Sequence, residues 1–258
     1  MRIGRQRERL ERHTVTEAFV GSRAAFYTTP PHVCSYLPPR KAATLFADPA
    51  LPKDRGLYSL LSEQGFRRSG VHLYRPSCPG CQACIPVRIP VQEFRPRRNQ
   101  RRTWDGNRDL HVVPGRAGFR AEYFDLYRRY LRARHPNGGM DDPSPEGFMD
   151  FLTAPWAETL FYEFRLGDLL LAIAVVDRLE HALSAVYTFY DPACRQRSLG
   201  RYAILHAIQE ARAHGLAWLY LGYWIAGCRK MRYKNEYQPL DYYVGGRWER
   251  ARTVNAGR

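Results

Sequence analysis

The sequence predicts an α+β fold, in which a mixed sheet is flanked by helices and follows a smaller, cysteine-containing amino-terminal domain. Three observations predict this fold class. Strand-like segments follow one another between residues 158 and 190, as in an antiparallel sheet. Helical periodicity surrounds them, at 119–134 and at 198–214. Residues 65–102 precede these segments. They are rich in arginine and contain three cysteines, a composition unlike that of the segments after residue 116.

Length and charge restrict the class of protein further. The 258 residues are enough for one large domain or two modest ones. A formal charge of +15 and a pI near 9.8 favour a polyanionic partner, either nucleic acid or an acidic membrane surface. No apolar run approaches the roughly 18 residues of a membrane span, and residues 1–13 lack the apolar segment of a secretory signal. We therefore expect a soluble cytoplasmic protein without structural disulfides.

The amino-terminal domain is expected at residues 1–115 and ends at the Pro114-Gly115 break. A short helix is expected at 57–64, and Gly65 follows it as a helix terminator. Pro86 and Pro90 lack the N–H that a central strand donates, so their strand is placed at an edge or a bulge. The other segments of this half are expected, in order, as a strand at 66–74, the proline-containing strand at 87–94, a polar connection at 95–108 and a brief strand at 110–113.

The carboxy-terminal domain is expected at residues 116–258, and its elements are easier to place. After the amphipathic helix at 119–134, a second helix begins at Ser144 with Pro145 in its first turn. The remaining elements are expected, in order, as strands at 158–166, 169–177 and 182–190, a helix at 198–214, a buried strand at 218–222, a turn into a basic helix, and a hairpin around Gly245-Gly246.

In its element order, the carboxy-terminal half is similar to the Gcn5-related N-acyltransferases. In that architecture, the loop before the third helix binds an acyl-CoA pyrophosphate and has a small residue at its last position. Here the loop is Arg197-Ser198-Leu199-Gly200-Arg201-Tyr202. A tyrosine at the end holds the backbone away from a pyrophosphate, which counts against acyl-CoA as the donor.

Seven motifs carry a closer resemblance: Cys34-Ser35-Tyr36-Leu37, GFRRSG from Gly65, YRPSCPGCQAC from Tyr74, RNQRR from Arg98, SAVYTFYDP from Ser184, SLGRY from Ser198, and LGYWIAGCRKMRYKNEYQP from Leu221. With them the chain resembles the bacterial aspartate/glutamate leucyltransferases, which are leucyl-tRNA-protein transferases of the arginyltransferase-like family. The similarity extends from about residue 13 to residue 250. It implies transfer of leucine from leucyl-tRNA to proteins that begin with Asp or Glu, which marks them for degradation by the N-degron route.

The residues fit such a reaction. An aminoacyl ester is already activated, so a positioning enzyme with a weak base and a donor for the oxyanion suffices, and no cofactor is required. Asp177 is the candidate base or amine-orienting group, with Tyr187 and Tyr190 as hydrogen-bond donors; the alternative is that Asp177 caps a turn. The candidates for binding the acidic side chain of the acceptor are the forked guanidinium groups of Arg67, Arg68, Arg75 and Arg88. Of these, Arg75 and Arg88 are favoured, because they flank the cysteine turn.

A tRNA acceptor stem requires phosphate contacts and stacking surfaces. The candidates for phosphate contacts are Arg95, Arg97, Arg98, Arg101, Arg102, Lys230, Arg232 and Lys234. Tyr223, Trp224 and Tyr233 are the candidates for stacking on the terminal bases, and ordinary packing is the alternative for each.

Cys34, Cys78, Cys81 and Cys84 provide four thiols, the number that a structural zinc site needs. The alternatives are an iron-sulfur cluster and reduced thiols without metal, and the last is preferred. Three other functions stay open from the residues: an arginyl-tRNA-protein transferase with the same acceptors, an acyl-CoA-dependent N-acetyltransferase, and a non-catalytic RNA-binding module.

Overall fold

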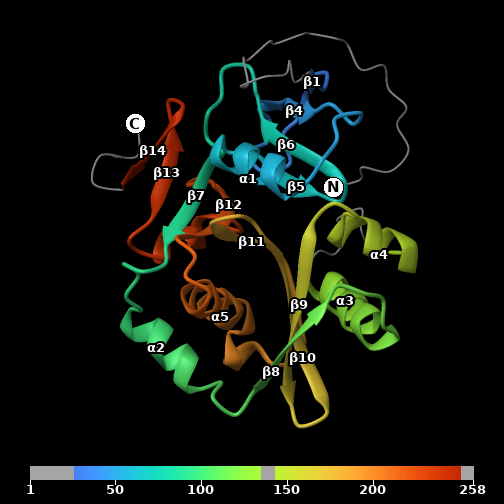
Figure 1. The fold of residues 1–258 in the computed structure, drawn as a ribbon, viewed down its shortest axis with the longest axis vertical. Helices are drawn as coiled ribbons and strands as arrows, with labels where there is room; N and C mark the ends of the chain where they lie inside the picture. The colour runs from blue at the N-terminus through green and yellow to red at the C-terminus, as the bar shows by residue number, and fades with distance from the viewer. Residues whose placement is uncertain (1–25, 135–142, 251–258) are drawn as a thin grey trace.

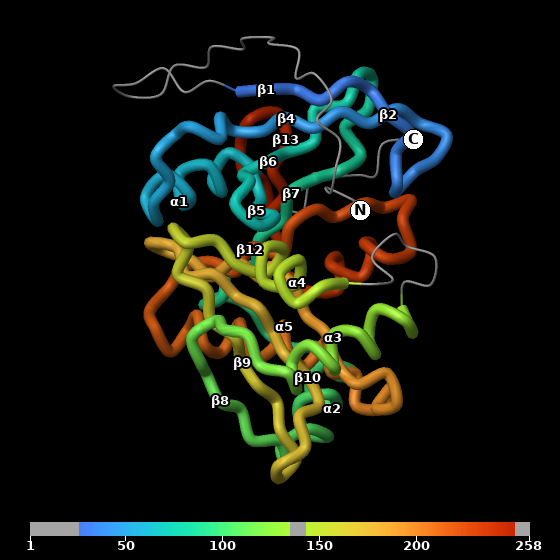
Figure 2. Tube along the Cα trace, turned by 90° about the vertical axis from the view of Figure 1, so that its right-hand side faces the viewer, coloured from blue at the N-terminus to red at the C-terminus, as the bar shows by residue number. Residues whose placement is uncertain are grey.

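The computed structural model describes residues 26–134 and 143–250. A mixed eight-stranded sheet runs through the molecule, and a four-stranded sheet lies at one end of it (Figures 1 and 2). The large sheet has the order β14-β13-β7-β12-β11-β10-β9-β8, and only β11 and β12 pair in parallel. Its strands are β7 (Ile85–Pro90), β8 (His111–Arg116), β9 (Glu158–Leu166), β10 (Leu169–Arg178), β11 (Ala182–Tyr190), β12 (Trp218–Trp224), β13 (Asp241–Val244) and β14 (Arg247–Arg250).

Helices cover both faces of the large sheet (Figure 1). On one face lie α5 (Leu199–Ala213) and α2 (Arg98–Asp105), and on the other lie α3 (Ala121–Arg134) and α4 (Pro145–Leu152). Along β10, Ile173 and Val175 pack against α3 and α4, whereas Ala174 and Val176 pack in the core that contains α5. A strand buried on both faces needs apolar residues at every position, which explains the unbroken apolar run of β10.

The four-stranded sheet has the order β1-β4-β6-β5, and it shares a core with the large sheet. Tyr58, Phe66 and Leu73 of this part pack together with Leu179, which follows β10, and with Tyr220 of β12. The elements are β1 (Phe26–Thr28), β4 (Thr44–Ala47), β5 (Arg67–Ser69), β6 (His72–Pro76) and the helix α1 (Arg55–Glu63), and a separate pair is formed by β2 (His32–Val33) and β3 (Lys41–Ala42).

Most elements expected in the carboxy-terminal half are confirmed. The three antiparallel strands β9, β10 and β11 lie within one residue of their expected limits. Ser144 accepts a hydrogen bond from the Gly147 N–H at 3.0 Å and begins α4, as its sequence predicts. Gly167 turns the first hairpin with a φ of 56°, a value that favours glycine. The expected basic helix near residue 230 is instead a single 3-10 segment, η2 (Arg232–Glu236).

Three expectations for the amino-terminal half are wrong. Residues 66–74 form two strands, because the chain turns at Gly70, where a side chain would collide with the Asp150 carbonyl. The proline-containing strand is β7, which lies inside the sheet, so its placement at an edge is wrong. The alternative of a bulge agrees with the register shift between Tyr220 and Gly222 of β12, opposite β7, and β13 pairs only with Val87 and Arg88, so no β13 partner faces either proline. The connection at 95–108 contains α2, whose narrow buried face consists of the polar residues Gln100 and Thr103.

Among the described residues, no helix has the length and apolar character needed to cross a membrane.

Candidate active site

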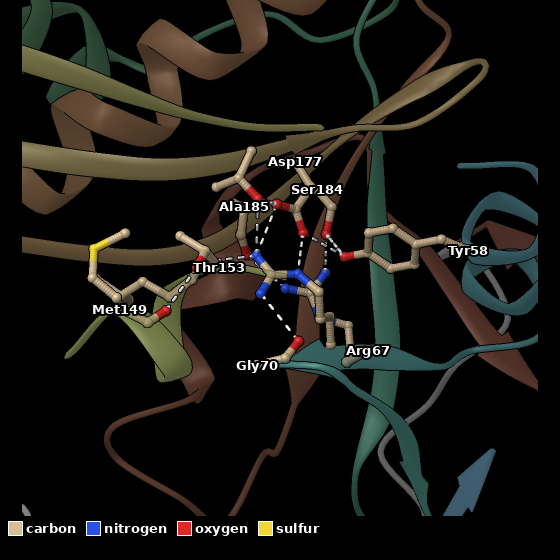
Figure 3. Close-up of polar contacts among 11 residues, drawn as sticks. Tyr58, Arg67, Gly70, Met149, Thr153, Asp177, Ser184 and Ala185 are labelled. Carbon is tan, nitrogen blue, oxygen red and sulfur yellow. Dashed lines mark hydrogen bonds and ion pairs between the residues drawn. The ribbon is translucent and has the colours of Figure 1, made fainter. Parts of the chain in front are cut away.

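The strands β11 and β12 separate soon after they meet. They pair only where Ala182–Ser184 face Trp218–Tyr220, and beyond these residues β11 continues to Tyr190 without β12 as a neighbour. Arg67 of β5 reaches into this separation (Figure 3). Its Nη2 donates to the Ala185 carbonyl at 2.6 Å, and its Nη1 donates to Ser184 Oγ at 2.9 Å. Gly222 makes room for it, since a Cβ there would lie 3.1 Å from Arg67 Nε.

Lys234 lies at the same place. Its side chain is buried, with 6% of its surface exposed, and Nζ donates to the Tyr223 carbonyl of β12 at 2.8 Å. Burial and, second, the cation of Arg67 lower the pKa of Lys234 from its usual range to about 7. No carboxylate of the described residues forms an ion pair with it. The amine of Lys234 is therefore neutral in a large fraction of molecules near pH 7.

This position contradicts the expectation that Lys234 contacts phosphate on the surface. Nothing in the run YKNEY distinguishes a buried lysine from an exposed one. Tyr223 is also buried, and its hydroxyl donates to the carbonyls of Gly65 and Tyr74, so it is not available for stacking. Trp224 packs against Tyr242, with ring centroids 5.5 Å apart, and its Nε1 donates to the Arg232 carbonyl. Lys230 and Arg232 are exposed, as a role in phosphate binding requires.

Asp177, the candidate base, belongs to a closed hydrogen-bond network (Figure 3). Its two oxygens lie 2.6 and 2.8 Å from Arg68 Nε and Nη2, and they also accept hydrogen bonds from Thr159 Oγ1 and the Tyr58 hydroxyl. Both side chains of the ion pair are 0% exposed. The remaining Arg68 donors reach the carbonyls of Gly70 and Leu152. Neither Asp177 nor Arg68 has a donor or acceptor accessible to a substrate, so this geometry gives both a structural role.

The two candidate tyrosines lie in different surroundings. Tyr187 packs among aromatic rings of α3 and α4, 5.3 Å from Phe151 and 6.2 Å from Tyr127, and burial raises its pKa. Tyr190 packs on Tyr130, with ring centroids 5.0 Å apart, and also lines a pocket at the start of α5. Tyr187 does not line this pocket.

The two favoured arginines do not lie in the separation between β11 and β12. The Arg88 guanidinium is stacked between two tryptophan rings, 3.7 Å from the centroid of Trp218 and 4.3 Å from that of Trp248. Arg75 donates to the Gln64 carbonyl and lies 5.0 Å from the Phe66 ring centroid. Among the four candidates for acceptor binding, Arg67 alone is placed beside Lys234.

The five arginines expected to contact tRNA form one exposed segment. Arg95 and the N-cap residue Arg97 precede α2, and the other three lie on the helix; all five side chains are exposed. A shallow pocket of about 290 Å³ continues this surface between the end of α2 and the 3-10 segment η1 (Arg195–Arg197). The pocket is lined in part by Arg102 and Arg197. The residues in question are Arg95, Arg97, Arg98, Arg101 and Arg102.

The candidate cysteine ligands gather in one region without forming a ligand set. Cys78 and Cys81 lie on the turn between β6 and β7, and burial together with neighbouring thiols raises the pKa of Cys84 to about 12. No disulfide joins any of the six cysteines. Within residues 26–134 and 143–250, no three Cys, His, Asp or Glu side chains are arranged to hold a metal ion. The fourth candidate, Cys34, accepts a hydrogen bond from the Leu37 N–H. No chemical step is therefore assigned to a metal.

Comparison with known proteins identifies relatives over most of the chain. Residues 32–102 match the family model of the arginine-tRNA-protein transferase N terminus, and residues 122–244 match that of its C terminus. The aspartate/glutamate leucyltransferase of Pseudomonas fluorescens (strain Pf0-1) is 54% identical over 227 residues, which cover 88% of this chain and 97% of the relative. The enzyme of the same name from Pseudomonas aeruginosa (strain LESB58) is 56% identical with the same coverage. The solved structure of L-PGS from Bacillus licheniformis matches with a TM-score of 0.45 and 12% identity, covering 56% of this chain and 48% of that one.

Proposed function

Because this chain belongs to the arginine-tRNA-protein transferase family, we propose that it transfers leucine from leucyl-tRNA to the N-terminal amine of proteins that begin with aspartate or glutamate. The added leucine marks these proteins for degradation by the N-degron route in the cytoplasm. The observation that carries the proposal is Lys234, a buried amine with a pKa of about 7 beside Arg67. Such a pair suits an acceptor that must lose a proton and also carries an acidic group.

Lys234 is the proposed proton acceptor. An N-terminal amine has a pKa of about 7.7–8.0, so most of it is protonated at neutral pH and cannot attack an ester. A general base is most effective when its pKa lies near the working pH, as the value of about 7 for Lys234 does. Its hydrogen bond to the Tyr223 carbonyl fixes Nζ in place and leaves the nitrogen lone pair for the substrate proton.

Transfer then needs no nucleophile from the protein and no cofactor. The acceptor amine attacks the carbonyl carbon of the leucyl ester, a C–N bond forms, and the C–O bond to the terminal ribose breaks. Lys234 takes one proton from the acceptor ammonium and later releases it to solvent. The attacking nitrogen loses a second proton as the amide forms, and this proton ends on the ribose oxygen of the uncharged tRNA, which leaves. Because the ester is already activated, holding amine and ester together in the right orientation lowers the barrier without further chemical help.

Arg67 is the proposed partner of the acidic side chain of the acceptor. Its terminal nitrogens each donate once within the protein, to Ala185 and Ser184, and each has a second N–H for a carboxylate. These two bonds fix the plane of the guanidinium, so the acceptor carboxylate meets an oriented fork. The same cation lowers the pKa of Lys234, and it therefore links recognition of the acceptor to the basicity of the proposed base.

The exposed arginines of α2 are the proposed contacts to tRNA phosphates. The helix packs beside α5, where the rings of Trp104 and Tyr202 have centroids 5.3 Å apart (Figure 1). An acceptor stem lying along α2 would thus have its end near the first turn of α5. The exposed residues Lys230, shortly before η2, and Arg232, its first residue, extend the basic surface toward Lys234.

The test is transfer of labelled leucine from leucyl-tRNA to peptides that differ only in their first residue. Peptides beginning with Asp or Glu should become labelled, whereas a peptide beginning with Ala should not. Arginyl-tRNA and acetyl-CoA are offered as alternative donors in parallel reactions. Label from arginyl-tRNA alone would identify an arginyltransferase, and label from acetyl-CoA alone an acetyltransferase. No transfer from any donor would contradict an enzymatic role.

A further inference from the structure

A second pocket, of about 190 Å³, opens at the start of α5 next to the candidate active site. Its lining comes from the end of β11, the first turn of α5 and the segment η2. Tyr233 connects it to the active site, because the neighbouring Lys234 has its Nζ 6.0 Å from the centroid of the Tyr233 ring. The lining residues are Tyr190, Ser198, Gly200, Arg201, Tyr233, Glu236 and Tyr237.

One wall of the pocket is formed by a largely buried tyrosine. Tyr237 is 1% exposed, and its ring lies near that of Phe94, with ring centroids 6.3 Å apart. Burial raises the pKa of Tyr237, and the Tyr233 hydroxyl and the charges of Arg201 and Glu236 act on it after burial. All four residues line the pocket.

Glu236 provides the only carboxylate of the lining. Its Oε2 lies 3.2 Å from Arg201 Nη2, and Oε1 has no partner among the described residues. The side chain of Glu236 is 41% exposed, so a ligand can reach it. On a chain with a formal charge of +15, a carboxylate among three tyrosine rings is a site for a small cation with apolar groups attached.

We propose that this pocket binds the leucyl group of the donor, with Glu236 holding its α-ammonium group and the three tyrosine rings surrounding its isobutyl side chain. The assignment rests on the proposed leucyl-tRNA function. Gly200 gives the side chain room, because a Cβ at this position would lie 3.3 Å from the Tyr190 ring and press it into the pocket. Arg201 in the lining repels an arginine side chain, so the pocket accepts leucine in preference to arginine as the transferred residue.

The test compares two stable analogues of the charged tRNA end. One is 3′-deoxy-3′-(leucylamino)adenosine, and the other carries a 4-methylpentanoyl group, which lacks only the α-amine. In calorimetric titrations the wild type should bind the first compound roughly tenfold more tightly, the value of one charge-assisted hydrogen bond. Glu236→Gln should lower this ratio to about one while the second compound keeps its affinity.

The matched control is Glu158→Gln. Glu158 also pairs with one arginine, Arg55, at 3.3 Å, and its side chain is 49% exposed, close to the value for Glu236. This variant should keep the wild-type ratio. An unchanged ratio in Glu236→Gln, or an equal loss for both compounds, would overturn the assignment. Leucine transfer by the wild type is measured separately: its absence overturns the proposed function, whereas a normal transfer rate with an unchanged ratio overturns only the pocket assignment.

Gly200→Ala tests the isobutyl site without risk to folding, since alanine is the better helix former by about 1 kcal/mol. The added methyl should move Tyr190 and weaken binding of the leucyl compound several times more than binding of a third analogue, 3′-deoxy-3′-(alanylamino)adenosine, which lacks the isobutyl group. If the ratio of leucyl to alanyl affinity is the same in the variant and the wild type, the isobutyl group does not bind at these rings.

Discussion

Arg67 and Arg68 are neighbours in the sequence but lie in different surroundings and have different roles. Successive residues of β5 point to opposite sides, so Arg68 enters the core and pairs with Asp177, whereas Arg67 enters the separation between β11 and β12. Each guanidinium nitrogen of Arg68 donates inside the protein, and the pair joins the small sheet to the large one. Arg67 lies beside the unpaired amine of Lys234 instead. The difference teaches that a carboxylate partner, more than burial alone, decides whether a cation stabilises the fold or remains available for chemistry.

Removing the carboxylate of the buried Arg68–Asp177 pair should have the largest effect on the free energy of unfolding. Asp177→Asn leaves the buried Arg68 cation without a counter-charge, and the free energy of unfolding should fall by about 4 kcal/mol in urea titrations. Asp105→Asn is the control, because Asp105 forms an exposed pair with Arg108 at 2.8 Å. The control should change the unfolding free energy by less than about 1 kcal/mol. Similar losses of unfolding free energy in the two variants would show that the buried pair contributes no more to stability than an exposed one.

Replacing Lys234, which has no carboxylate partner among the described residues, should affect catalysis more than folding. Lys234→Met should lower kcat/KM for transfer to an Asp-peptide roughly a thousandfold, since it removes the proposed proton acceptor. In the wild type, kcat/KM should rise with pH as Lys234 loses its proton near the pKa of about 7. In the variant the component near pH 7 should be missing, and only the rise from deprotonation of the acceptor amine, at about pH 7.7–8.0, should remain. Lys41→Met, at an exposed lysine of β3, should keep most of the activity. Full activity of Lys234→Met would show that another group takes the proton.

The role of Arg67 in acceptor choice should be visible in the KM for acidic peptides. Arg67→Gln should raise the KM for an Asp-peptide roughly tenfold, because a charge-assisted contact is lost. The low activity on an Ala-peptide should change little. Arg75→Gln serves as the comparison, since Arg75 lies near Phe66 and Gln64. A larger loss with Arg75→Gln would return acceptor binding to the residues flanking the cysteine turn.

The lowered pKa of Lys234 also predicts how stability depends on pH. Above about pH 7 the folded protein has released the Lys234 proton, whereas the unfolded chain keeps it up to about pH 10.4. The unfolded state binds more protons in this window, so the unfolding free energy should increase with pH by about 1.4 kcal/mol per unit from this group. The difference between wild type and Lys234→Met, measured in urea from pH 7.5 to 9.5, isolates the contribution. No pH dependence of that difference would contradict the lowered pKa.

The α2 surface should give the smallest effect per residue, and it appears in the salt dependence of tRNA binding. Replacing Arg97, Arg98 and Arg101 by Gln should reduce the slope of log affinity against log salt by about 2. The matched control changes Arg128, Arg132 and Arg134 of α3, on the opposite face of the sheet. An equal change in both triple variants would mean that only total charge matters.

Local patterns predicted the carboxy-terminal half because its signals lie close together in the sequence. Gly167 and Gly215 mark turns, and β9, β10 and β11 follow one another in an antiparallel order that hairpins alone produce. In contrast, α2 escaped prediction because its buried face is made of Gln100 and Thr103, which do not look apolar. The similarity of the element order to Gcn5-related N-acyltransferases stays a prediction.

The candidate site was harder to predict, since its contacts join distant parts of the chain. Arg68 and Asp177 are 109 residues apart, and Asp177 considered alone resembles either a base or a turn residue. The burial of Lys234 depends on β12 and on Arg67, neither of which its own neighbours reveal. One signal was present in the sequence: Arg67 and Arg68, adjacent on a strand, had to face opposite sides, so they could not both bind the acceptor.

The strand β7 has a consequence for any attempt to divide the chain. It belongs to the first hundred residues, yet it sits between β12 and β13 with neighbours on both edges. A fragment that begins after it would present two bare strand edges and the apolar surface around Leu219, and such edges recruit other chains. Fragments corresponding to the two matched family models should therefore aggregate when made separately, and recover a soluble assembly only when they are produced together.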